Sequence, residues 1–414
     1  MTTKTAHTAA KKRIFAANSQ FFMREVYIVS MSRTPIGSFG GALAALTAPQ
    51  LGATAIKSAI ERAGIQPTDV QEVYMGNVLS ANIGQAAVTQ AMLGAGIPDT
   101  ASSTGINKVC ASGMKAIMVA AQQIMLGSAD IVVAGGMESM SNAPYYLPKE
   151  RWGAKMGHTE VVDAIIKDGL WDPYGNKHMG SCGETCARTY NFSREDQDNY
   201  AISSYKRAAE AWKNGAFAKE ITPVVIPQKK GDPIVVAEDE DYTKVKFDRV
   251  PTLSPAFEKE GTITAANASN INDGAAAVVL MSKERAEAMG IKPIARIIGF
   301  ADAQQTPEWF TTTPAKAMPK AIAAAGLQVA DIDLFEINEA FAVVALANMR
   351  ELNISHDKTN IYGGAVSLGH PIGCSGARIT ITLLSALINT NGRYGCAGIC
   401  NGGGGASAIV IERL

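Results

Sequence analysis

The sequence predicts an α/β protein made of two related halves that pack face to face. Three observations support this fold class. Strand-like and helix-like apolar patterns alternate in both the N-terminal and the C-terminal thirds of the chain. Two short motifs of the first third recur in the last third at nearly the same offset. Each of these thirds also has a helix pattern that is apolar nearly all round, and such a helix is buried on every side.

The first half contains an ordered series of strand and helix patterns. Residues 26–30, 70–78 and 131–134 read as strands, and residues 51–63 read as a helix that ends at Gly64. This alternation predicts a large share of parallel sheet. A second helix pattern, over residues 112–126, has almost no polar face, so we expect it to lie between two layers.

The middle of the chain has a different composition. Residues 141–266 contain more charged and aromatic side chains, an amphipathic helix pattern over residues 195–214 and a charged stretch over residues 238–248. We expect a loop-rich domain inserted into the α/β fold. The expected boundaries are 1–24 for an N-terminal leader or tail, 25–141 with 271–294 for the first half, 142–270 for the inserted domain and 295–414 for the second half.

The second half repeats features of the first. Regular patterning returns at residues 275–281, and the Ala-Gly-Ile-Gln sequence at Ala63 is followed 262 residues later by Ala-Gly-Leu-Gln at Ala325. The Ser-Gly pair at Ser112 recurs 263 residues later at Ser375, ahead of an apolar helix pattern over residues 378–389. We therefore expect the two apolar helices to share a middle layer.

Composition limits the possible partners and compartments. Lys plus Arg equals Asp plus Glu, 38 against 38, and there is no basic stripe, which disfavours nucleic acid as a partner. No uninterrupted apolar run is long enough to cross a membrane. Six cysteines in a long chain favour a reducing compartment. The first 24 residues are basic and lack Asp and Glu, which is typical of either a mitochondrial (matrix) transit peptide or a flexible tail of a cytoplasmic protein.

Cys110 precedes the first apolar helix and is a candidate nucleophile. The N–H groups and the positive dipole end of a helix lower the pKa of a nearby thiol, and the thiolate is the reactive form. The alternative is a cysteine that only fills space in the core.

Three other segments contain candidate catalytic groups. His370 lies among glycines ahead of the second apolar helix, where it could take a proton from Cys110 across the interface between the halves, unless it is only a turn histidine bonded to the backbone. Cys400 precedes four glycines whose N–H groups can stabilise an oxyanion. Asn338 follows a strand pattern over residues 334–337 and could hold a water molecule or a carbonyl group.

Four segments together resemble the signature motifs of the thiolase family. They are Asn-Lys-Val-Cys-Ala-Ser-Gly from Asn107, Asn-Glu-Ala-Phe from Asn338, Gly-His-Pro from Gly369 and Cys-Asn-Gly-Gly from Cys400. The resemblance extends from about residue 26 to residue 414 and is strongest to acetyl-CoA acetyltransferases of the mitochondrial, potassium-responsive type. It implies a five-layered αβαβα thiolase fold with an inserted loop domain.

The resemblance implies a catalytic role for five residues. Cys110 resembles the nucleophile that becomes acetylated, and His370 resembles the base that activates it. Cys400 resembles a second acid/base that removes a proton from the methyl group of an incoming acetyl-CoA. One oxyanion hole would be formed by His370 and a water held by Asn338, and the other by the N–H groups of Cys110 and Gly402.

The resemblance also implies binding residues. Coenzyme A would be a substrate and product rather than a tightly bound cofactor, and would contact Tyr205, Lys244, Val245, Lys246, Arg249 and Ser269, with His178 and Met179 lining the acyl pocket. A potassium ion would be held by Tyr205 and by main-chain carbonyl groups of Ala265, Ala266, Ala268 and Val366. From the residues alone, Lys244, Lys246 and Arg249 are more typical of an ordinary solvated charged loop. The resemblance further implies a homotetramer, built as a dimer of dimers.

The expected reaction is the reversible condensation of two acetyl-CoA molecules to acetoacetyl-CoA and CoA, with thiolysis as its reverse and 2-methylacetoacetyl-CoA as a further candidate substrate. One alternative is a degradative 3-ketoacyl-CoA thiolase of broad specificity, which the His178-Met179 pair disfavours. A condensing ketoacyl synthase would lack the second cysteine that Cys400 supplies. A non-catalytic protein that binds acyl-CoA or lipid is the third alternative, although such proteins typically lose catalytic residues.

Overall fold

The structure is a computed structural model that describes residues 23–414. The predicted leader, residues 1–24, lies outside the described residues except for its last two. Of these, Arg24 forms ion pairs with Asp130 and Glu284, so it is attached to the folded body.

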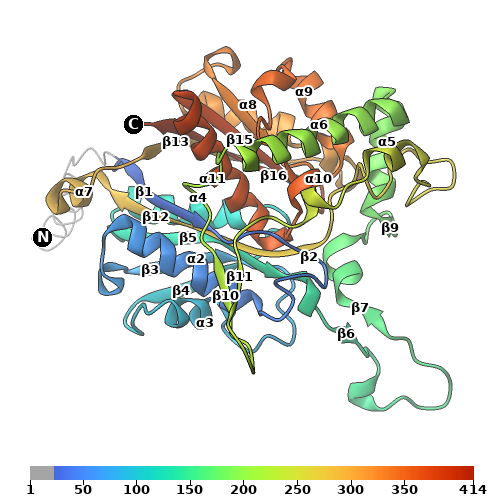
Figure 1. The fold of residues 1–414 in the computed structure, drawn as a ribbon, viewed down its shortest axis with the longest axis horizontal. Coiled ribbons are helices and arrows are strands. Elements are labelled where there is room, and N and C mark those ends of the chain that lie inside the picture. The colour runs from blue at the N-terminus through green and yellow to red at the C-terminus, as the bar shows by residue number, and fades with distance from the viewer. Residues whose placement is uncertain (1–22) are drawn as a thin grey trace, which may run out of the picture.

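The strands of the main sheet fall into two groups, one from each half of the chain (Figure 1). Across the first group the order is β4 (Ser102–Ile106), β3 (Glu72–Gly76), β5 (Ile131–Ser139), β12 (Asn272–Ser282) and β1 (Val26–Arg33), with β2 (Gly37–Ser38) paired to β12. Across the second group the order is β14 (Leu334–Ile337), β15 (Tyr394–Asn401), β16 (Gly405–Arg413) and β13 (Ala295–Gln304). The groups join where the first residues of β1 pair with β13.

Five layers result, in the order αβαβα (Figure 1). The outer helices are α2 (Ala48–Ala63) and α3 (Ala87–Gly94) on one side, and α8 (Pro314–Ala324) and α9 (Ala342–Leu352) on the other. Helices α4 (Ser112–Met125) and α11 (Ile372–Thr390) form the middle layer, and α11 contacts strands of both groups. The prediction of two α/β halves that share a buried helical layer is confirmed.

The repeat is visible in the strand order. Strands β3, β5, β12 and β1 of the first group correspond to β14, β15, β16 and β13 of the second. The first group ends at β4, and the second has in that place a single parallel bridge between Phe335 and Thr359. The expected share of parallel sheet was too large. Among the strand pairs of the described residues, β3–β4, β3–β5 and β14–β15 are parallel and the others are antiparallel. The last strand of each half, β12 or β16, returns antiparallel to its neighbours.

The two central helices approach each other through glycines at equivalent positions. A Cβ atom on Gly376 would lie 2.5 Å from the main-chain nitrogen of Met114, and one on Gly113 would lie 2.9 Å from that of Ala377. Such contacts are too short for any side chain, so glycine at these positions permits the close helix packing. Helix α11 is apolar and long enough to cross a membrane, but its side chains are packed inside the protein, as expected for a core helix.

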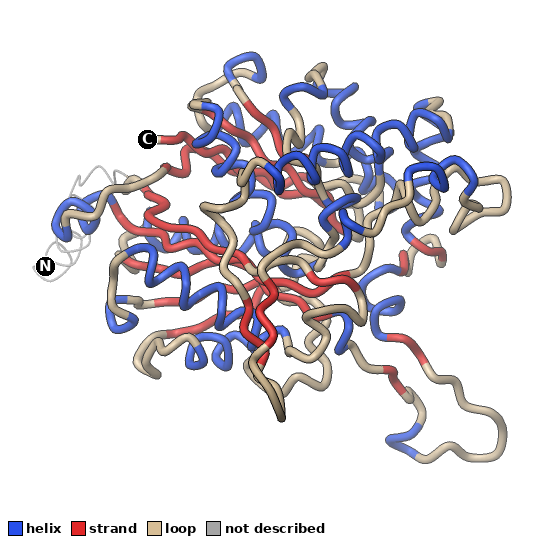
Figure 2. The backbone as a smooth tube through the Cα atoms, viewed as in Figure 1, coloured by secondary structure: helices blue, strands red, loops and turns tan. Residues whose placement is uncertain are grey.

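The chain between β5 and β12 forms the excursion that the sequence predicted (Figure 2). It contains α5 (Met179–Tyr190), α6 (Arg194–Lys213) and the short hairpins β6–β7 (Tyr145–Tyr146, Val162–Asp163), β8–β9 (Trp171–Asp172, Lys177–His178) and β10–β11 (Val224–Ile226, Ile234–Val236). The remaining helices are α7 (Lys283–Met289) and α10 (Ala365–Leu368). The chain has two pairs of cysteines that are four residues apart, and all four are buried. Cys182 and Cys186 lie in α5, and Cys396 and Cys400 lie in β15.

Candidate active site

Cys110 lies in the turn between β4 and α4 and is almost fully buried. The preceding residue, Val109, has a φ of 47°, which is unfavourable for a β-branched side chain. Ser112 stabilises this turn, because its hydroxyl accepts a hydrogen bond from the Lys108 N–H at 2.8 Å and donates one to the Val109 carbonyl at 2.6 Å. A strained turn held by local hydrogen bonds is typical of a functional site.

His370 lies directly before α11, as predicted, and is 5% exposed. Gly369 has a φ of 104°, and the side chain of Asn272 occupies the space where a Cβ of Gly369 would be. The Asn272 Oδ1 atom accepts a hydrogen bond from the His370 main-chain N–H at 2.8 Å. The ring of His370 contacts Ser375 through Nδ1 at 2.6 Å and Asn338 through Nε2 at 3.5 Å. Both the main chain and the ring of this histidine are therefore held.

The remaining predicted catalytic residues gather at the carboxyl ends of β14 and β15. Asn338 is buried directly after β14, and its N–H donates to the Gly398 carbonyl of β15 at 3.0 Å. Its Oδ1 atom is buried without a hydrogen-bond partner among the described residues. Cys400 is buried near the end of β15, close enough to Cys110 for the charge of one to affect the pKa of the other. The Gly402 N–H approaches the Cys110 sulfur and favours its anionic form.

The ionisation of this site differs from the sequence-based expectation. We expected the helix end to lower the pKa of Cys110, but burial raises that pKa to about 12, and the N–H groups of Gly402 and Cys110 offset only part of the effect. Burial also raises the pKa of Cys400 well above its usual value. Burial, and then the positive charge of Arg378, lower the pKa of His370 to about 3. The resting site therefore holds neutral thiols and a neutral imidazole.

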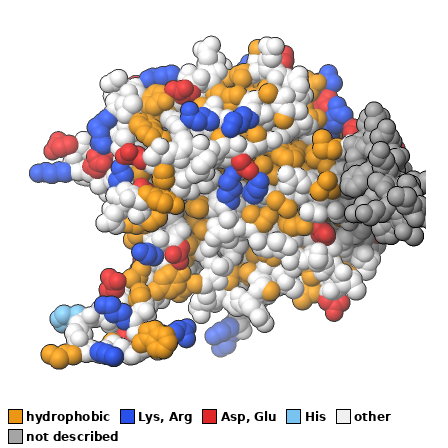
Figure 3. Space-filling model, turned by 180° about the vertical axis from the view of Figure 1, so that it is seen from behind, with side chains coloured by type: hydrophobic (Ala, Val, Ile, Leu, Met, Phe, Trp, Pro, Cys, Tyr) orange, Lys and Arg blue, Asp and Glu red, His pale blue; other side chains and the backbone are white. Residues whose placement is uncertain are grey.

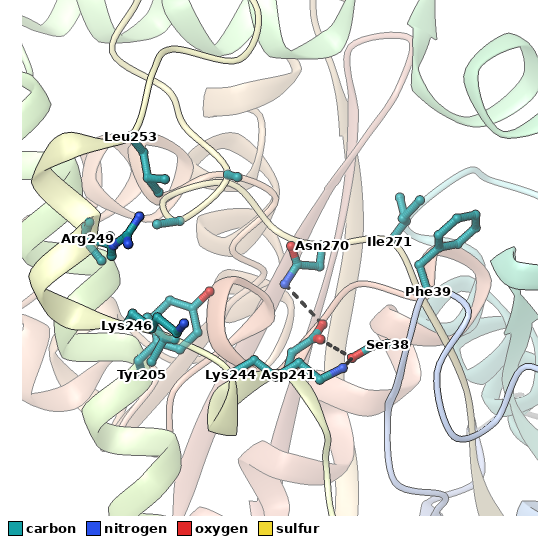
Figure 4. Close-up of a pocket in the computed structure, with 14 residues that line it drawn as sticks. Ser38, Phe39, Tyr205, Asp241, Lys244, Lys246, Arg249, Leu253, Asn270 and Ile271 are labelled. Atoms are coloured by element: carbon teal, nitrogen blue, oxygen red, sulfur yellow. Dashed lines mark hydrogen bonds between the residues drawn. The ribbon is translucent and has the colours of Figure 1, made fainter.

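A cavity of about 550 Å³ has Asp241 in its wall (Figure 4), and Asp241 bonds to Asn272, which in turn holds the His370 main chain. Of the predicted CoA contacts, Tyr205, Lys244, Val245, Lys246 and Arg249 line it. Neighbouring side chains hold Lys244, since its Nζ atom lies 2.7 Å from the Glu240 carboxylate and 2.6 Å from the Ser38 hydroxyl. Lys246 and Arg249 form no ion pair with any described residue, so the cavity carries two cations that can bind an anionic group.

The other predicted contacts lie outside the cavity lining. The Ser269 hydroxyl donates to the Ala340 carbonyl at 2.9 Å, next to Asn270, which does line the cavity. Met179 packs in the same apolar cluster as Cys400, and a Cβ atom added to Gly402 would lie 3.6 Å from the Met179 sulfur. The His178 ring stacks on Phe257 at a centroid distance of 4.6 Å, and its Nδ1 atom accepts the Gly180 N–H at 3.0 Å.

Three of the five predicted potassium ligands line the cavity, whereas Ala268 packs in the apolar cluster that contains Met179 and Cys400. The three that line the cavity are Tyr205, Ala265 and Ala266, and Val366 packs against Tyr205. Within the described residues, the Tyr205 hydroxyl has no hydrogen-bond partner, and the carbonyl groups of Ala265, Ala266, Ala268 and Val366 accept no N–H. Unpaired carbonyl and hydroxyl oxygens are the type of ligand that a hard cation prefers.

Several supporting residues were not predicted. Glu138, fully buried at the end of β5, accepts hydrogen bonds from the N–H groups of Val78, Leu79 and Gly373 and so attaches the His370 loop to the first half. Burial raises the pKa of Glu138 to about 7. The contacts of Glu138 are recognisable only from the fold. Ser375, which contacts the His370 ring, could have been found from the sequence, because it matches Ser112 in the repeat.

Two further unpredicted residues connect the cavity to the His370 loop. Asp241, on the cavity wall, accepts hydrogen bonds from Ser38, Asn270 and Asn272 (Figure 4). Glu339 accepts hydrogen bonds from Tyr200 and Ser204 at 2.8 Å each and from the Val366 N–H at 3.0 Å. Glu339 joins the excursion to the segment that precedes His370, and Asp241 joins it to Asn272, which accepts the His370 main-chain N–H.

Comparison with known proteins identifies the family. The N-terminal domain model of thiolases matches residues 26–284, and the C-terminal domain model matches residues 291–413. The chain belongs to the thiolase family. Among its relatives it is 56% identical to acetyl-CoA acetyltransferase 2 of Arabidopsis thaliana over 393 residues, which cover 94% of this chain and 98% of that protein.

Other thiolases are nearly as similar. A cytosolic acetyl-CoA acetyltransferase of Gibberella zeae is 55% identical, with 94% of this chain and 98% of that protein covered. The mitochondrial acetyl-CoA acetyltransferase of Mus musculus is 55% identical, with 95% and 92% covered. The crystal structure of Acat5 thiolase from Ascaris suum in complex with coenzyme A matches with a TM-score of 0.89 and 46% identity, covering 94% of this chain and all of that one.

Proposed function

We propose that the chain is an acetyl-CoA acetyltransferase that condenses two acetyl-CoA molecules to acetoacetyl-CoA and CoA, and catalyses the reverse thiolysis. The observation that carries the proposal is the meeting of two buried cysteines, Cys110 and Cys400, with an N–H donor, Gly402, between the central helix and the last strands. One thiol suits a covalent intermediate, and the other suits proton transfer.

In the first half-reaction, the Cys110 sulfur attacks the thioester carbonyl of acetyl-CoA. His370 takes the thiol proton at Nε2 during the attack, because a thiol whose pKa is near 12 does not ionise beforehand. The carbonyl oxygen becomes an oxyanion that the N–H groups of Cys110 and Gly402 stabilise. When the C–S bond to coenzyme A breaks, Cys400 donates its proton to the departing sulfur. This leaves acetyl-Cys110, a Cys400 thiolate and His370 protonated at Nε2.

In the second half-reaction, Cys400 takes a proton from the methyl group of a second acetyl-CoA. The resulting enolate oxygen is stabilised by a donor set of His370, protonated at Nε2, and a water bound to the unpaired Oδ1 of Asn338. The enolate carbon attacks the acetyl-Cys110 carbonyl, and the C–S bond to Cys110 breaks. This step forms the new C–C bond of acetoacetyl-CoA. The Cys110 sulfur regains its proton from Nε2 of His370, and Cys400 keeps the proton taken from the methyl group, which restores the resting site.

Coenzyme A is proposed to occupy the 550 Å³ cavity. Lys246 and Arg249, which have no partner carboxylate among the described residues, would bind its phosphate groups. Tyr205, Lys244, Val245 and Ser269 would contact the rest of the molecule, and His178 and Met179 would limit the acyl group. The position of Met179 supports this placement, since its side chain packs in the same apolar cluster as Cys400, one of the proposed reacting groups.

We further propose the potassium-responsive subtype, with the ion at Tyr205 and the carbonyl groups of Ala265, Ala266, Ala268 and Val366. The support is that these oxygens have no other partners among the described residues. When bound, the ion would supply a fixed positive charge at the cavity edge and would order the segment that contains Val366, four residues before His370.

A homotetramer is proposed on the basis of an exposed arm. The segment that joins β6 to β7 extends away from the body (Figures 1 and 3). It exposes large apolar side chains, among them Trp152 at 82% and Met156 at 106%, and such groups are typical of contacts with another protein. Mass measurement by light scattering tests this, with Trp152→Ser in the same run. A monomer mass for both the wild type and the Trp152→Ser variant would contradict the proposed tetramer.

A mitochondrial matrix location is proposed, with the cytoplasm as the alternative. The support is the basic, acid-free composition of residues 1–24 and the 55% identity to a mitochondrial enzyme, whereas an equally similar relative is cytosolic. A reporter fused to residues 1–24 and expressed in eukaryotic cells distinguishes the two locations.

The proposed domain boundaries are those expected from the sequence. The first half is residues 25–141 with 271–294, the inserted domain is residues 142–270, and the second half is residues 295–414.

The experiment that tests the proposed function is CoA-dependent cleavage of acetoacetyl-CoA in matched potassium and sodium buffers. We expect cleavage in both and a higher rate in potassium. Equal rates would contradict the ion site, and no cleavage by folded protein would contradict the enzyme. A series of 3-ketoacyl-CoA substrates, including 2-methylacetoacetyl-CoA, tests the alternative of a broad-specificity thiolase, which predicts cleavage that persists as the acyl chain lengthens.

A further inference from the structure

The ring of His370 makes a contact that the mechanism above does not explain. Its Nδ1 atom lies 2.6 Å from the Ser375 hydroxyl, and both residues are buried. The same hydroxyl donates to the Pro371 carbonyl, one helical turn earlier, at 3.0 Å. A serine hydroxyl has a single hydrogen, so a hydroxyl that donates to Pro371 can only accept from the ring. With the hydroxyl donating to Pro371, the hydrogen between Ser375 and the ring lies on Nδ1 of His370.

The contact of the other ring nitrogen favours the same tautomer of His370. The Nε2 atom of His370 faces the Nδ2 amide group of Asn338 at 3.5 Å, and an amide nitrogen donates hydrogen bonds but does not accept them. With the amide turned this way, the Nε2 atom that faces it carries its lone pair. Two neighbours from different elements, α11 and the turn after β14, thus select the same neutral tautomer.

We propose that Ser375 is a positioning residue that keeps the hydrogen of neutral His370 on Nδ1, so that Nε2 is the atom that takes and returns protons. The inference rests on the proposed function, in which His370 is the base for Cys110. A base needs its lone pair on the side of the reacting atom, and the hydrogen bond made by the other ring nitrogen sets which nitrogen is free. After accepting a proton, the ring donates from the same Nε2 atom.

The equivalent serine of the first half has a related arrangement. Ser112, which corresponds to Ser375 in the repeat, accepts the Lys108 N–H at 2.8 Å and donates to a carbonyl of its own turn at 2.6 Å. In both halves, the serine at the start of the central helix accepts from an N–H of the functional loop and donates to a main-chain carbonyl. In one half the donor is the backbone before Cys110, and in the other it is the imidazole.

The first test reads the tautomer directly in the wild-type protein. The chain has five histidines, so ¹⁵N magic-angle-spinning NMR of the histidine-labelled protein gives few signals, and the His370→Asn variant identifies those of His370. At neutral pH we expect Nδ1 to resonate as a protonated nitrogen and Nε2 as an unprotonated one. The reverse assignment in an active enzyme would overturn the inference and leave the proposed function intact, whereas an inactive wild type would remove the function.

The second test uses variants of Ser375. Because general-base catalysis contributes about 10²–10⁴-fold, we expect Ser375→Ala to lower kcat at least about tenfold with little change in KM, and to make the Nε2-protonated tautomer visible. Ser375→Thr keeps the hydroxyl and is expected to restore the wild-type tautomer and most of kcat. Thr380→Val is the matched control, because its buried hydroxyl donates to the Gly376 carbonyl of the same helix without contacting His370.

The outcomes separate positioning from simple stability. If Ser375→Ala keeps both the wild-type tautomer and the wild-type kcat, Ser375 has no such role and the inference is wrong. If Thr380→Val loses as much kcat as Ser375→Ala, the effect comes from destabilising α11, and the inference is again wrong. If Ser375→Ala does not fold, the wild-type NMR assignment and the Ser375→Thr variant still decide the question.

Discussion

The Cys110 thiol and the His370 ring are both almost fully buried, and burial disfavours the charged form of each. Neutral groups in the resting site mean that the proton moves during attack rather than before it. The N–H groups that face Cys110 then act mainly on the charge that develops in the reaction. This gives the site a different starting state from the thiolate that the helix position had suggested.

The pH dependence of alkylation tests this starting state. Because the pKa of Cys110 is near 12, we expect its alkylation by iodoacetamide to rise about tenfold per pH unit from pH 7 to 9, without a plateau. The pKa of His370 is near 3, so we expect no break near pH 6.5. The rate is read by mass spectrometry of the Cys110 peptide, with acetyl-CoA as a protecting control. A plateau below pH 8 would indicate a thiolate in the resting enzyme.

The cations of the cavity give a second prediction for single residues. A hydrogen bond to a charged group contributes about 1.5–3 kcal/mol, so Lys246→Ala with Arg249→Ala is expected to raise KM for acetyl-CoA about tenfold or more while kcat changes little. The rise should shrink as salt is added, because the interaction is screened. Lys230→Ala, in the exposed β10–β11 turn, is the control. An unchanged KM would mean that the phosphate groups of coenzyme A do not bind to Lys246 and Arg249.

The proposed catalytic residues could be named from the sequence because each lies in a short motif beside an apolar strand or helix. The residues that support them could not. Glu138 and Asn272 come from β5 and β12, and their contacts with the His370 loop depend on how distant strands are brought together. The raised pKa of Cys110 was missed for a related reason, since burial by both halves outweighs the local effect of the helix end.

At the scale of elements, the central pair α4 and α11 sets the distance between the two catalytic loops. Each helix begins directly after one of them, and the helices touch through Gly113 and Gly376. The repeat in the sequence revealed this pairing because Ser-Gly occurs at both positions. The strand directions were predicted less well, because an apolar strand pattern carries no information about the direction of its neighbour.

Enlarging the contact between these helices should separate the loops. We expect Gly376→Ala to destabilise the protein by about 1–3 kcal/mol, because its Cβ would lie 2.5 Å from the backbone of Met114, and to lower kcat more than KM. Urea denaturation and steady-state kinetics measure the two effects. Gly94→Ala in α3 is the control, since its Cβ would meet only the Ala53 methyl group at 3.1 Å. Equal behaviour of the two variants would contradict the importance of the helix contact.

At the scale of the whole molecule, all six cysteines are free and buried. Burial raises the pKa of Cys374 and Cys110 to about 12, and it raises the pKa of Cys396 and Cys400 as well. In the unfolded chain these thiols have a pKa near 8.5, so above that pH the unfolded state releases protons that the folded state retains. Raising the pH therefore favours unfolding.

Alkaline denaturation measures this linkage. We expect the free energy of unfolding to fall above pH 9 by about 1.4 kcal/mol per pH unit for each fully buried thiol. Cys374→Ala removes one such group outside the catalytic set, so its stability should fall less steeply with pH than that of the wild type. Urea titrations between pH 8 and 10.5 provide the slopes. Parallel slopes for the two proteins would mean that Cys374 ionises equally in both states.

The fold class, the repeat and the middle layer were predictable because buried helices and repeated motifs leave a strong pattern in one chain. The cavity was predictable only through family resemblance. Its walls come from β2, α6, the segment around Lys246 and the loop before β12, which are far apart in the sequence and have no shared pattern. Contacts formed by four distant segments depend on the complete fold, and a sequence read in order does not contain them explicitly.

The measurement that tests the central claim most directly is the detection of acetyl-Cys110. The enzyme is mixed with acetyl-CoA, quenched with acid, and its cysteine peptides are analysed by mass spectrometry. We predict one acetyl group per chain, on Cys110, in the wild type and in Cys400→Ala, and its loss on addition of CoA. Cys110→Ala should carry none. An acetyl group on another residue, or turnover by Cys110→Ala, would contradict the account.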